Sequence, residues 1–174
     1  MSLSILPFAP RHAPAVRELF IRVNRLLAPA AMKERFEAYI ERSLGEEIDR
    51  IDDYYRARSG GFWVAVDGES VVGMFGLEQI APEAMELRRM YVDPDQRRRG
   101  IARKMLAFAE AECDRRGFSR LDLSTSELQA EALALYHSAG YRLLREELAT
   151  EASNKTLGGG IKRYYFAKEL RARA

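Results

Sequence analysis

The chain has 174 residues, of which 47% are apolar, and it carries 28 lysines and arginines against 26 aspartates and glutamates. This length fits one globular domain, and a net charge of +2 argues against a nonspecific nucleic-acid binder. One cysteine cannot form an internal disulfide, and two histidines cannot build a rich metal site. No apolar run approaches the length of a membrane span, and the N-terminus lacks the pattern of a secretory signal. We therefore expect a cytoplasmic protein with no metal ion and no membrane contact.

The first third of the chain is expected to form a short strand followed by helices. Residues 3–8 predict the strand. Apolar residues at intervals of three and four predict a helix over residues 14–27, with a proline in its first turn. A second amphipathic segment covers residues 32–44 and is expected to end at Gly45. A third, shorter segment with helical spacing covers residues 48–55.

After residue 60 the apolar spacing changes to two, which is typical of β-strands. Residues 62–66 and 71–79 are expected to form a hairpin, because the Asp67-Gly68 pair between them favours a tight turn. Residues 85–92 predict a third strand, which ends before a proline. The middle of the chain is therefore expected to be an antiparallel meander.

The second half of the chain alternates helices with strands. A helix is predicted over residues 100–116, and the later elements are a strand at 121–124, a helix at 131–138, a strand at 141–147, a flexible stretch at 153–160 and a last strand at 161–168. No repeat or linker divides the chain. This order predicts an α/β (α+β) fold, in which one mixed sheet has helices on its faces.

The turn between the third strand and the helix at residue 100 is the most informative segment. The first N–H groups of a helix lack partners within the helix and form the positive end of its dipole, so they bind phosphate readily. Gly100 lets the backbone approach a ligand, and Ala102 is small for the same reason. Cations surround the turn, namely Arg97, Arg98, Arg99, Arg103 and Lys104. The turn therefore predicts an anion pocket for a phosphorylated ligand.

Other interpretations of this turn are weaker. The nucleoside-triphosphate motif G-x-x-x-x-G-K-[ST] is missing, and no G-x-G-x-x-G follows a strand, so dinucleotide binding is not indicated. A run of arginines alone is more typical of a solvated face or a nucleic-acid patch. The position of this run, between a strand end and an apolar helix, favours the anion pocket instead.

The sequence around the turn resembles the GCN5-related N-acetyltransferases, the GNAT family. Residues 97–102 match the family motif [Q/R]-x-x-G-x-[G/A], and residues 87–94 are similar to the strand that precedes it. Residues 135–141, Leu-Tyr-His-Ser-Ala-Gly-Tyr, are similar to the family signature Leu-Tyr-x-x-x-Gly-Phe/Tyr. Within the family, three further segments are similar to the camello-like N-acetyltransferases, at residues 62–66, 72–74 and 124–129.

This resemblance implies one GNAT-like domain over residues 1–174, with a mostly antiparallel sheet that is splayed where acetyl-coenzyme A binds. Residues 1–60 would shape the acceptor site. Residues 61–147 would form the acetyl-coenzyme A-binding core, and residues 148–174 would supply a flexible loop and the last strand.

The resemblance also implies that acetyl-coenzyme A is the co-substrate. Its pyrophosphate would lie on the backbone amides of residues 97–103, and its pantetheine arm would pair with the strand near Met90 and Val92. Gln129 stands where family members often have asparagine, and its side chain is longer. The implied cofactor-binding residues are Met90, Tyr91, Val92, Arg97, Arg98, Arg99, Gly100, Ile101, Ala102, Arg103 and Gln129.

Catalytic roles are expected for a tyrosine and a glutamate. By resemblance, Tyr136 occupies the general-acid position, where a phenol can protonate the departing thiolate. Glu86 is the first choice for the base, because it lies on the central strand with the side-chain parity of Arg88 and Met90 unless a bulge shifts it. Glu78 is the reserve. The plainer alternatives are that Tyr136 only packs against the sheet and that Glu86 only forms a salt bridge with a neighbouring arginine.

Several other conspicuous residues have simpler interpretations. His12 and His137 are expected on the surface, Cys113 in the core and Trp63 inside the sheet. The many acids of residues 26–55 are expected to form a solvated helical face.

Together these inferences predict an N-acetyltransferase that moves acetyl directly to a primary amine of a small molecule (an amino acid, an amine or a conjugate) or of a peptide. Residues 26–55 and 150–160 would shape the acceptor site, and the choice between a cationic amine and an amino acid with a carboxylate stays open. One alternative is a non-catalytic acyl-coenzyme A-binding or sensor module on the same fold, and another is a nucleic-acid-binding domain. The leading interpretation needs an amine acceptor, no nucleic acid and no membrane, and is compatible with a homodimer.

Overall fold

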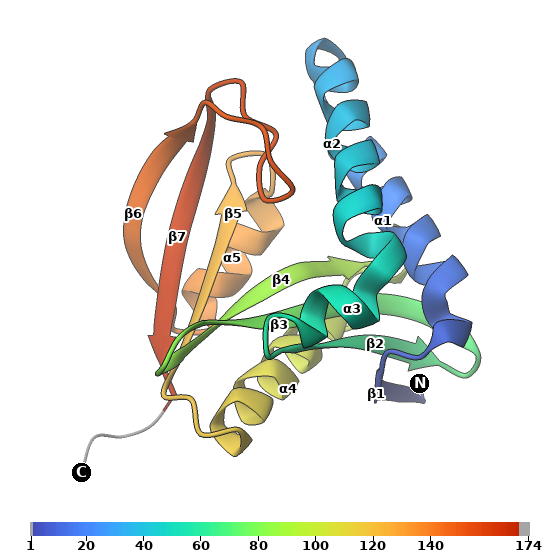
Figure 1. Cartoon of the computed structure of the whole chain (residues 1–174), viewed down its shortest axis with the longest axis vertical. Helices are drawn as coiled ribbons and strands as arrows, with labels where there is room; N and C mark the ends of the chain where they lie inside the picture. Colours follow the sequence, from blue (N-terminus) through green and yellow to red (C-terminus); the bar gives the residue numbers. More distant parts are fainter. Residues whose placement is uncertain (1, 171–174) are drawn as a thin grey trace.

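A seven-stranded sheet organises residues 2–170, the part of the chain that the computed structural model describes (Figure 1). The strand order is β1-β2-β3-β4-β5-β7-β6, and every neighbouring pair is antiparallel except β4 and β5. The strands are β1 (Leu3–Pro7), β2 (Gly61–Asp67), β3 (Ser70–Ala81), β4 (Ala84–Val92), β5 (Arg120–Ser126), β6 (Arg142–Ala149) and β7 (Ile161–Glu169). The predicted α/β fold with a mixed, mostly antiparallel sheet is therefore confirmed.

Five α-helices flank the sheet in the described residues: α1 (Ala13–Leu27), α2 (Lys33–Glu46), α3 (Ile51–Arg56), α4 (Ile101–Arg115) and α5 (Ala130–Ser138). The expected stop at Gly45 is wrong, since α2 continues through it to Glu46. The backbone N–H of Glu47 donates to the Ser43 carbonyl at 3.0 Å, so the last turn of the helix spans the glycine.

Alternate side chains of β2 enter two different cores. Phe62 and Val64 pack with helices α1 to α3, on the side of the sheet that we call the α1 face. Trp63 and Ala65 pack with α4, on the opposite side, which we call the α4 face. The Trp63 ring stacks on Phe75 at 5.4 Å between centroids, so this tryptophan lies inside the sheet as expected. Because β2 is covered on both faces, its sequence is a continuous apolar run.

A β-bulge interrupts β4 in its middle. Gly76 of β3 pairs with Arg88, but the next pair is Met74 with Tyr91, so β4 carries one extra residue. Arg89 takes up the irregularity with a left-handed φ of 56°. A bulge of this kind bends a strand and increases its twist.

The bulge also reverses the side-chain alternation of β4. Before it, Met85 and Leu87 pack on the α4 face; after it, Met90 packs on the α4 face and Tyr91 on the α1 face. Met90 therefore does not share the face of Glu86 and Arg88. The sequence analysis expected Glu86, Arg88 and Met90 on the same face unless a bulge intervened, and the bulge moves Met90 to the other face.

The sheet opens between β4 and β5. Their parallel ladder ends at the pair Glu86 and Asp122, while β4 continues to Val92 and β5 continues alongside β7. Figure 1 shows the result as two groups of strands, β1–β4 and β5–β7, that fan away from each other. The chain between β6 and β7 reaches across the open end towards α2. The predicted splay is present.

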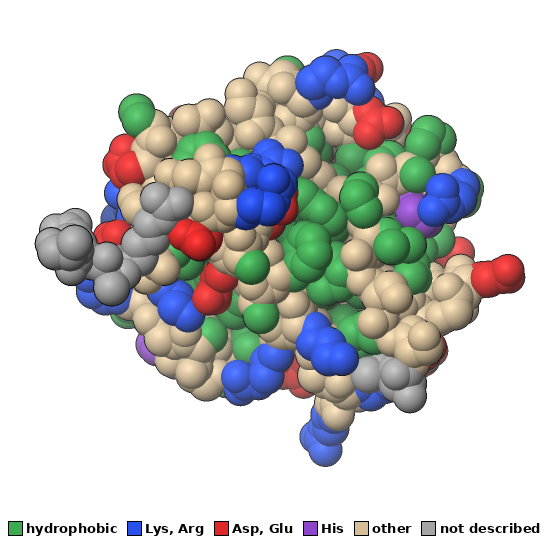
Figure 2. Space-filling view, turned by 90° about the horizontal axis from the view of Figure 1, so that it is seen from below, with side chains coloured by type: hydrophobic (Ala, Val, Ile, Leu, Met, Phe, Trp, Pro, Cys, Tyr) green, Lys and Arg blue, Asp and Glu red, His purple; other side chains and the backbone are tan. Residues whose placement is uncertain are grey.

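Figure 2 views the molecule from the α4 end, where hydrophobic side chains gather near the centre of the face. Lysine, arginine and acidic side chains lie scattered around them. This face therefore does not carry a continuous basic patch of the kind that binds nucleic acid.

Candidate active site

The turn before α4 has the geometry of an anion-binding loop. Two of its residues, Arg98 and Gly100, adopt left-handed φ values of 63° and 74°. Gly100 is the N-cap of α4 and offers no side chain to the first helical amides. A Cβ added at Gly100 would meet nothing within 4 Å, so the space in front of the helix is open. The unpaired amides and the positive end of the helix dipole thus face free space.

The arginines of the turn do not all face this space. Arg97 is nearly half exposed, and its nearest acid is Glu131 at 4.0 Å. Arg103 donates to the Ser138 hydroxyl at 2.8 Å. Arg99 instead pairs with the Asp67 carboxylate at 3.0 Å, in the turn between β2 and β3. Arg99 therefore braces the turn, and the other arginines remain beside the helix N-terminus.

A long groove of about 800 Å³ runs from α4 to α5 across the splayed strands. Of the eleven residues predicted to bind the co-substrate, ten line this groove, and Arg99 is the exception. The ten are Met90, Tyr91, Val92, Arg97, Arg98, Gly100, Ile101, Ala102, Arg103 and Gln129. The edge of β4 that faces the groove has lost its partner β5, so its backbone can pair with an extended ligand.

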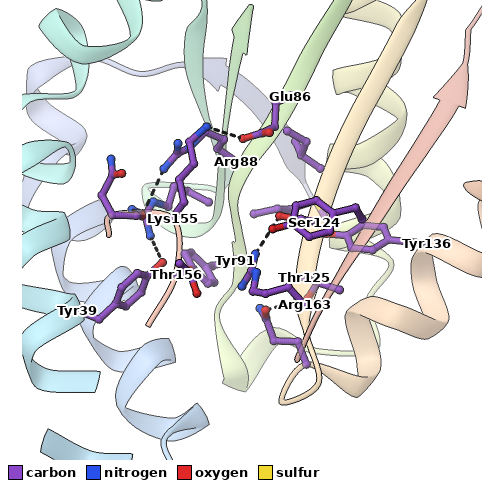
Figure 3. Close-up of a pocket in the computed structure, with 16 residues that line it drawn as sticks. Tyr39, Glu86, Arg88, Tyr91, Ser124, Thr125, Tyr136, Lys155, Thr156 and Arg163 are labelled. Atoms are coloured by element: carbon purple, nitrogen blue, oxygen red, sulfur yellow. Dashed lines mark hydrogen bonds and ion pairs between the residues drawn. The ribbon is translucent and has the colours of Figure 1, made fainter. Parts of the chain in front are cut away.

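A small pocket of about 160 Å³ lies on the other side of the same opening. It shares four residues with the long groove: Met90, Tyr91, Gln129 and Tyr136. Figure 3 shows its two walls, with Tyr39, Lys155 and Thr156 facing Ser124, Thr125 and Arg163. The groove and the pocket therefore meet at one place, where Tyr136 lies.

Tyr136 is buried, and burial raises the pKa of its phenol well above the ordinary value of 10. Its ring packs against Tyr141 and Phe166 at about 6 Å between centroids. Among residues 2–170, none forms a hydrogen bond with its hydroxyl. The phenol is thus held protonated, and no neighbour in the described chain occupies its donor.

Gln129 is the N-cap of α5, and within residues 2–170 only the oxygen of its side-chain amide forms hydrogen bonds. Its side-chain oxygen accepts hydrogen bonds from the Thr125 hydroxyl at 2.8 Å and from the Ser126 amide at 3.3 Å. These bonds fix the side chain at the junction of groove and pocket. Its NH₂ group has no partner in the described part of the chain.

Glu86 and Glu78 lie side by side on neighbouring strands and share a lysine. Lys155 Nζ is 2.9 Å from Glu78 Oε1 and 3.3 Å from Glu86 Oε1. Glu86 therefore does form a salt bridge, but with a lysine and not with an arginine. Glu78 is buried and also lies near Arg88 at 3.4 Å and Arg58 at 3.5 Å, whereas the Glu86 side chain is 24% exposed.

A buried ion cluster supports this region from behind. Glu47 is fully buried, and its carboxylate accepts hydrogen bonds from Arg88 at 2.7 Å, Arg89 at 3.0 Å and the Tyr55 hydroxyl at 2.6 Å. Burial alone would raise the pKa of Glu47, but the two guanidinium groups and the hydrogen bonds lower it below its usual value.

The solvated helical face expected from the acids of residues 26–55 therefore does not include Glu47. The only sign in the sequence is its spacing, three residues after Leu44 and four before Ile51, although the structure places Glu47 at the break after α2 and not on a helix.

Arg163 differs from the other cations of the small pocket. It donates to the Ser124 hydroxyl at 2.9 Å, and no acid lies within ion-pair distance of it among residues 2–170. The strand pattern of β7 gives no sign of this role, because a partly exposed arginine on a strand is common. Only the pairing of β7 with β5 brings Arg163 to the pocket.

The remaining conspicuous residues lie outside the site. Cys113 is buried, and burial raises the pKa of its thiol to about 12. His137 is exposed, as expected. His12 is only 7% exposed, which corrects the surface expectation, and its Nδ1 accepts from the Ala9 amide at 3.0 Å. No group of three or more potential metal ligands occurs in the described residues.

A sequence model of the Acetyltransferase (GNAT) family matches residues 28–141. The chain belongs to the GNAT family. The match covers α2 to α5 and so includes the anion-binding turn and Tyr136.

Similar proteins agree with this assignment. Human N-acetyltransferase 8 is 30% identical over 116 residues, 63% of this chain and 51% of that protein. Human N-acetylaspartate synthetase is 34% identical over 130 residues, 67% of this chain and 42% of that protein. The GNAT domain thus spans about half the length of the curated relatives it matches. The likeness to N-acetyltransferase 8 agrees with the camello-like resemblance.

A solved structure supports the fold over nearly the whole chain. The PaiA N-acetyltransferase from Thermoplasma acidophilum, in complex with coenzyme A, superimposes with a TM-score of 0.74 and 18% identity, covering 97% of this chain and 99% of that one. Within residues 2–170 of this GNAT domain, no helix is both long and apolar enough to cross a membrane.

Proposed function

We propose that this domain transfers an acetyl group from acetyl-coenzyme A to the primary amine of a small acceptor. The observation that carries the proposal is the junction of two cavities. A long groove begins at a helix N-terminus, and a small polar pocket meets it at Met90, Tyr91, Gln129 and Tyr136. An enzyme that joins a long phosphorylated donor to a small acceptor needs this arrangement.

The long groove fits the co-substrate in two respects. Its phosphate end has a left-handed glycine with open space in front of it and three arginines alongside, Arg97, Arg98 and Arg103. Its other end has an unpaired strand edge at Met90 and an amide side chain at Gln129. A pantetheine arm carries amide groups that pair with such an edge.

Tyr136 is assigned to protonate the departing thiolate. The neutral phenol is its dominant form at any ordinary pH because burial raises its pKa. A protonated donor at the junction of the two cavities supports a general-acid role more than a purely structural one.

Glu86 is assigned as the base that accepts a proton from the acceptor ammonium. It lines the small pocket and is bound by Lys155 alone in the described structure. Glu78 is a poorer candidate because three cations, Arg58, Arg88 and Lys155, already neutralise it. The base must reach the ammonium directly or through water.

The acceptor is assigned to amines that also carry a carboxylate, such as amino acids or their conjugates. Arg88, Arg89 and Lys155 are each paired with an acid, whereas Arg163 has only Ser124. An unpaired guanidinium in a pocket favours a ligand carboxylate, which it can bind with two hydrogen bonds. One similar protein, N-acetylaspartate synthetase, is named for an acetylated amino acid.

The experiment measures free thiol release from acetyl-coenzyme A with a panel of amines, matched in pairs with and without a carboxylate. We expect turnover with carboxylated amines, and an increase in their KM of roughly 10–100-fold in Arg163→Gln, the size expected for a lost charged hydrogen bond. The KM of the matched amines that lack a carboxylate should not change in this variant. Donor binding is followed separately by thermal shift with acetyl-coenzyme A.

Two results would count against the proposal. Absence of thermal stabilisation by acetyl-coenzyme A would remove the donor site. Stabilisation without thiol release for any amine would favour the non-catalytic binding module.

A further inference from the structure

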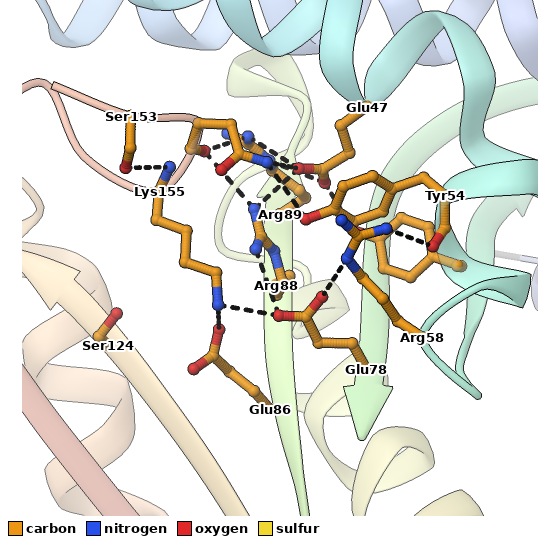
Figure 4. A network of polar contacts seen from close by, with 12 residues as sticks. Glu47, Tyr54, Arg58, Glu78, Glu86, Arg88, Arg89, Ser124, Ser153 and Lys155 are labelled. Carbon is orange, nitrogen blue, oxygen red and sulfur yellow. Dashed lines mark hydrogen bonds and ion pairs between the residues drawn. The ribbon is translucent and has the colours of Figure 1, made fainter. Parts of the chain in front are cut away.

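The side chain of Lys155 places a primary amine of the protein itself at the small pocket. The residue lies in the segment between β6 and β7, and its Nζ sits between Glu78 Oε1 at 2.9 Å and Glu86 Oε1 at 3.3 Å (Figure 4). Its side chain is 50% exposed, so the ammonium is held by the acids without being sealed from the pocket. Lys155 and Tyr136 line the same cavity.

The backbone beside Lys155 is tied to the buried ion cluster. The Asn154 side chain donates to the Tyr54 hydroxyl at 3.1 Å and to Glu47 at 3.3 Å, and the backbone carbonyl of Asn154 accepts from Arg89. The Ser153 hydroxyl accepts from the Lys155 amide at 3.0 Å. The lysine is therefore presented by a fixed backbone, which raises its effective concentration at the site.

The five lysines of the chain differ in this respect. Lys155 lines the small pocket, whereas Lys33, Lys104, Lys162 and Lys168 line neither this pocket nor the long groove. Lys168 pairs with Glu110 at 2.9 Å and Lys162 with Glu146 at 3.8 Å, both away from the junction. Position alone therefore distinguishes one lysine from the rest.

We propose that Lys155 is an acetyl acceptor within its own chain, so that the domain acetylates itself when no small amine is present. This inference rests on the proposed acetyl-transfer function. Lys155 loses one proton to the Glu86 carboxylate or to water, and its Nζ forms a bond with the acetyl carbon as the carbon–sulfur bond breaks. The nitrogen loses a second proton to water, and Tyr136 protonates the thiolate and regains a proton from water. The products are acetyl-lysine, coenzyme A thiol and one proton.

The charges around Lys155 make the reaction slow at neutral pH. Burial by itself lowers the pKa of Lys155, but Glu86 and Glu78 outweigh it and raise the pKa above its ordinary value of 10.5. The other charges that face it are Arg88 of β4 and, beyond Glu78, Arg58. The reactive neutral amine is therefore scarce at pH 7 and increases with pH, so the test is run at pH 7 and pH 9.

Acetylation would also release the segment from the acids. Glu78 would keep Arg88 and Arg58, but Glu86 would lose the one cation bound to it in the described structure. Amides of residues 151–156 should then exchange hydrogen faster, which gives a readout that is independent of turnover.

The test incubates the full chain with acetyl-coenzyme A and no added amine, followed by mass spectrometry of the intact protein and its peptides. We expect one acetyl group per chain, on Lys155, at a fractional rate that does not depend on protein concentration. Lys155→Arg should take up none there, and Tyr136→Phe should slow the modification by a factor on the order of 10²–10⁴. The exposed Lys33 and Lys104 report spontaneous acetylation in the same sample. Glu86→Gln is a second variant in case Tyr136→Phe folds poorly.

Three results would overturn the inference: acetylation of Lys155 no faster than that of Lys33 and Lys104, a rate unaffected by both active-site substitutions, or a rate that rises with protein concentration. A parallel assay of small amines separates the two proposals. If small amines are acetylated while Lys155 stays unmodified, self-acetylation is wrong and the proposed function stands. If neither reacts, both are wrong.

Discussion

The Glu47 carboxylate accepts a hydrogen bond from the Arg88 guanidinium at 2.7 Å, and both side chains are almost completely buried. This contact joins the end of α2 to the bulge in β4, 41 residues apart in sequence. The bulge bends β4 just beyond the last pair of its ladder with β5, and the ion cluster holds the strand in this shape.

Glu47→Gln should destabilise the fold strongly at neutral pH. The substitution keeps the shape but leaves the buried Arg89 guanidinium without a counter-charge and Arg88 with Glu78 alone. Breaking a buried pair in this way costs about 3–5 kcal/mol in the free energy of unfolding. The folded pKa of Glu47 lies below its ordinary value of 4.5, so its stabilisation is complete above that pH and is lost as the pH falls further. The stability difference between wild type and variant should therefore shrink in acid.

Chemical unfolding from pH 7 to pH 3 measures this difference. Asp49→Asn, which removes a surface ion pair with Arg17, is the control and should change stability by less than about 1 kcal/mol. A difference for Glu47→Gln that stayed constant over the pH range would show that the carboxylate carries no buried charge.

The sequence predicted those features that depend on neighbouring residues. Residues 97–102 indicated an anion-binding turn because a helix start, a glycine and cations all lie within six positions. The hairpin at Asp67-Gly68 and the helical stripe of α1 are equally local. Strand β2 was predicted from a spacing of two and from the turn that follows it, whereas the structure buries both of its faces.

The features that the sequence did not predict depend on long-range contacts. Glu47 looked like one acid among many, and only the approach of β4 turns it into the centre of a cluster. Lys155 and Arg163 reach the small pocket through the path of the segment before β7 and the order β5-β7-β6. The sequence analysis allowed for a bulge in β4 but did not predict one at Arg89, because no local signal indicates a left-handed φ at an arginine.

Gly100→Val should weaken acetyl-coenzyme A binding. Its Cβ branch would stand in the open space before the α4 amides, where the phosphates are proposed to lie. The left-handed φ of 74° also makes valine costly there, by about 1–3 kcal/mol in stability. Isothermal titration should show a large rise in the Kd of acetyl-coenzyme A.

Gly68→Val is the control for Gly100→Val, because it introduces similar backbone strain without blocking the proposed phosphate site. Gly68 has a similar φ of 62°, and an added Cβ there also meets nothing within 4 Å, but it lies in the β2–β3 turn. We expect a similar loss of stability with an unchanged Kd. Equal Kd values for the two variants would contradict the phosphate assignment.

Glu86→Gln should reduce turnover mainly at low pH, where the acceptor amine is most protonated and a base is most needed. The substitution also weakens the ion pair with Lys155, so Lys155→Gln is the control: it breaks the same pair and keeps the carboxylate. The pH profile of kcat/KM should change in Glu86→Gln and keep its shape in Lys155→Gln. A wild-type profile in Glu86→Gln would move the role of base to Glu78 or to water.

Tyr136→Phe removes one hydroxyl and keeps the ring. Because no described residue hydrogen-bonds that hydroxyl, the free energy of unfolding should change by less than about 1.5 kcal/mol. Tyr141→Phe is the matched control: its ring lies 6.0 Å from that of Tyr136, but its hydroxyl donates to Glu110 at 3.0 Å, and it lines neither cavity. This variant should lose about 1 kcal/mol in stability and keep its kcat.

If Tyr136 protonates the thiolate, kcat of Tyr136→Phe should fall by a factor on the order of 10²–10⁴ with donor affinity nearly unchanged. The low end is expected, because the thiol of coenzyme A is a fairly good leaving group. The raised pKa of Tyr136 keeps the phenol protonated, so the wild-type rate should show no loss from its ionisation below pH 10. Single-turnover kinetics with a verified acceptor measure the chemical step. A fall of less than about threefold, no larger than that of Tyr141→Phe, would assign Tyr136 to packing alone and leave the groove as a binding site whose acid lies elsewhere.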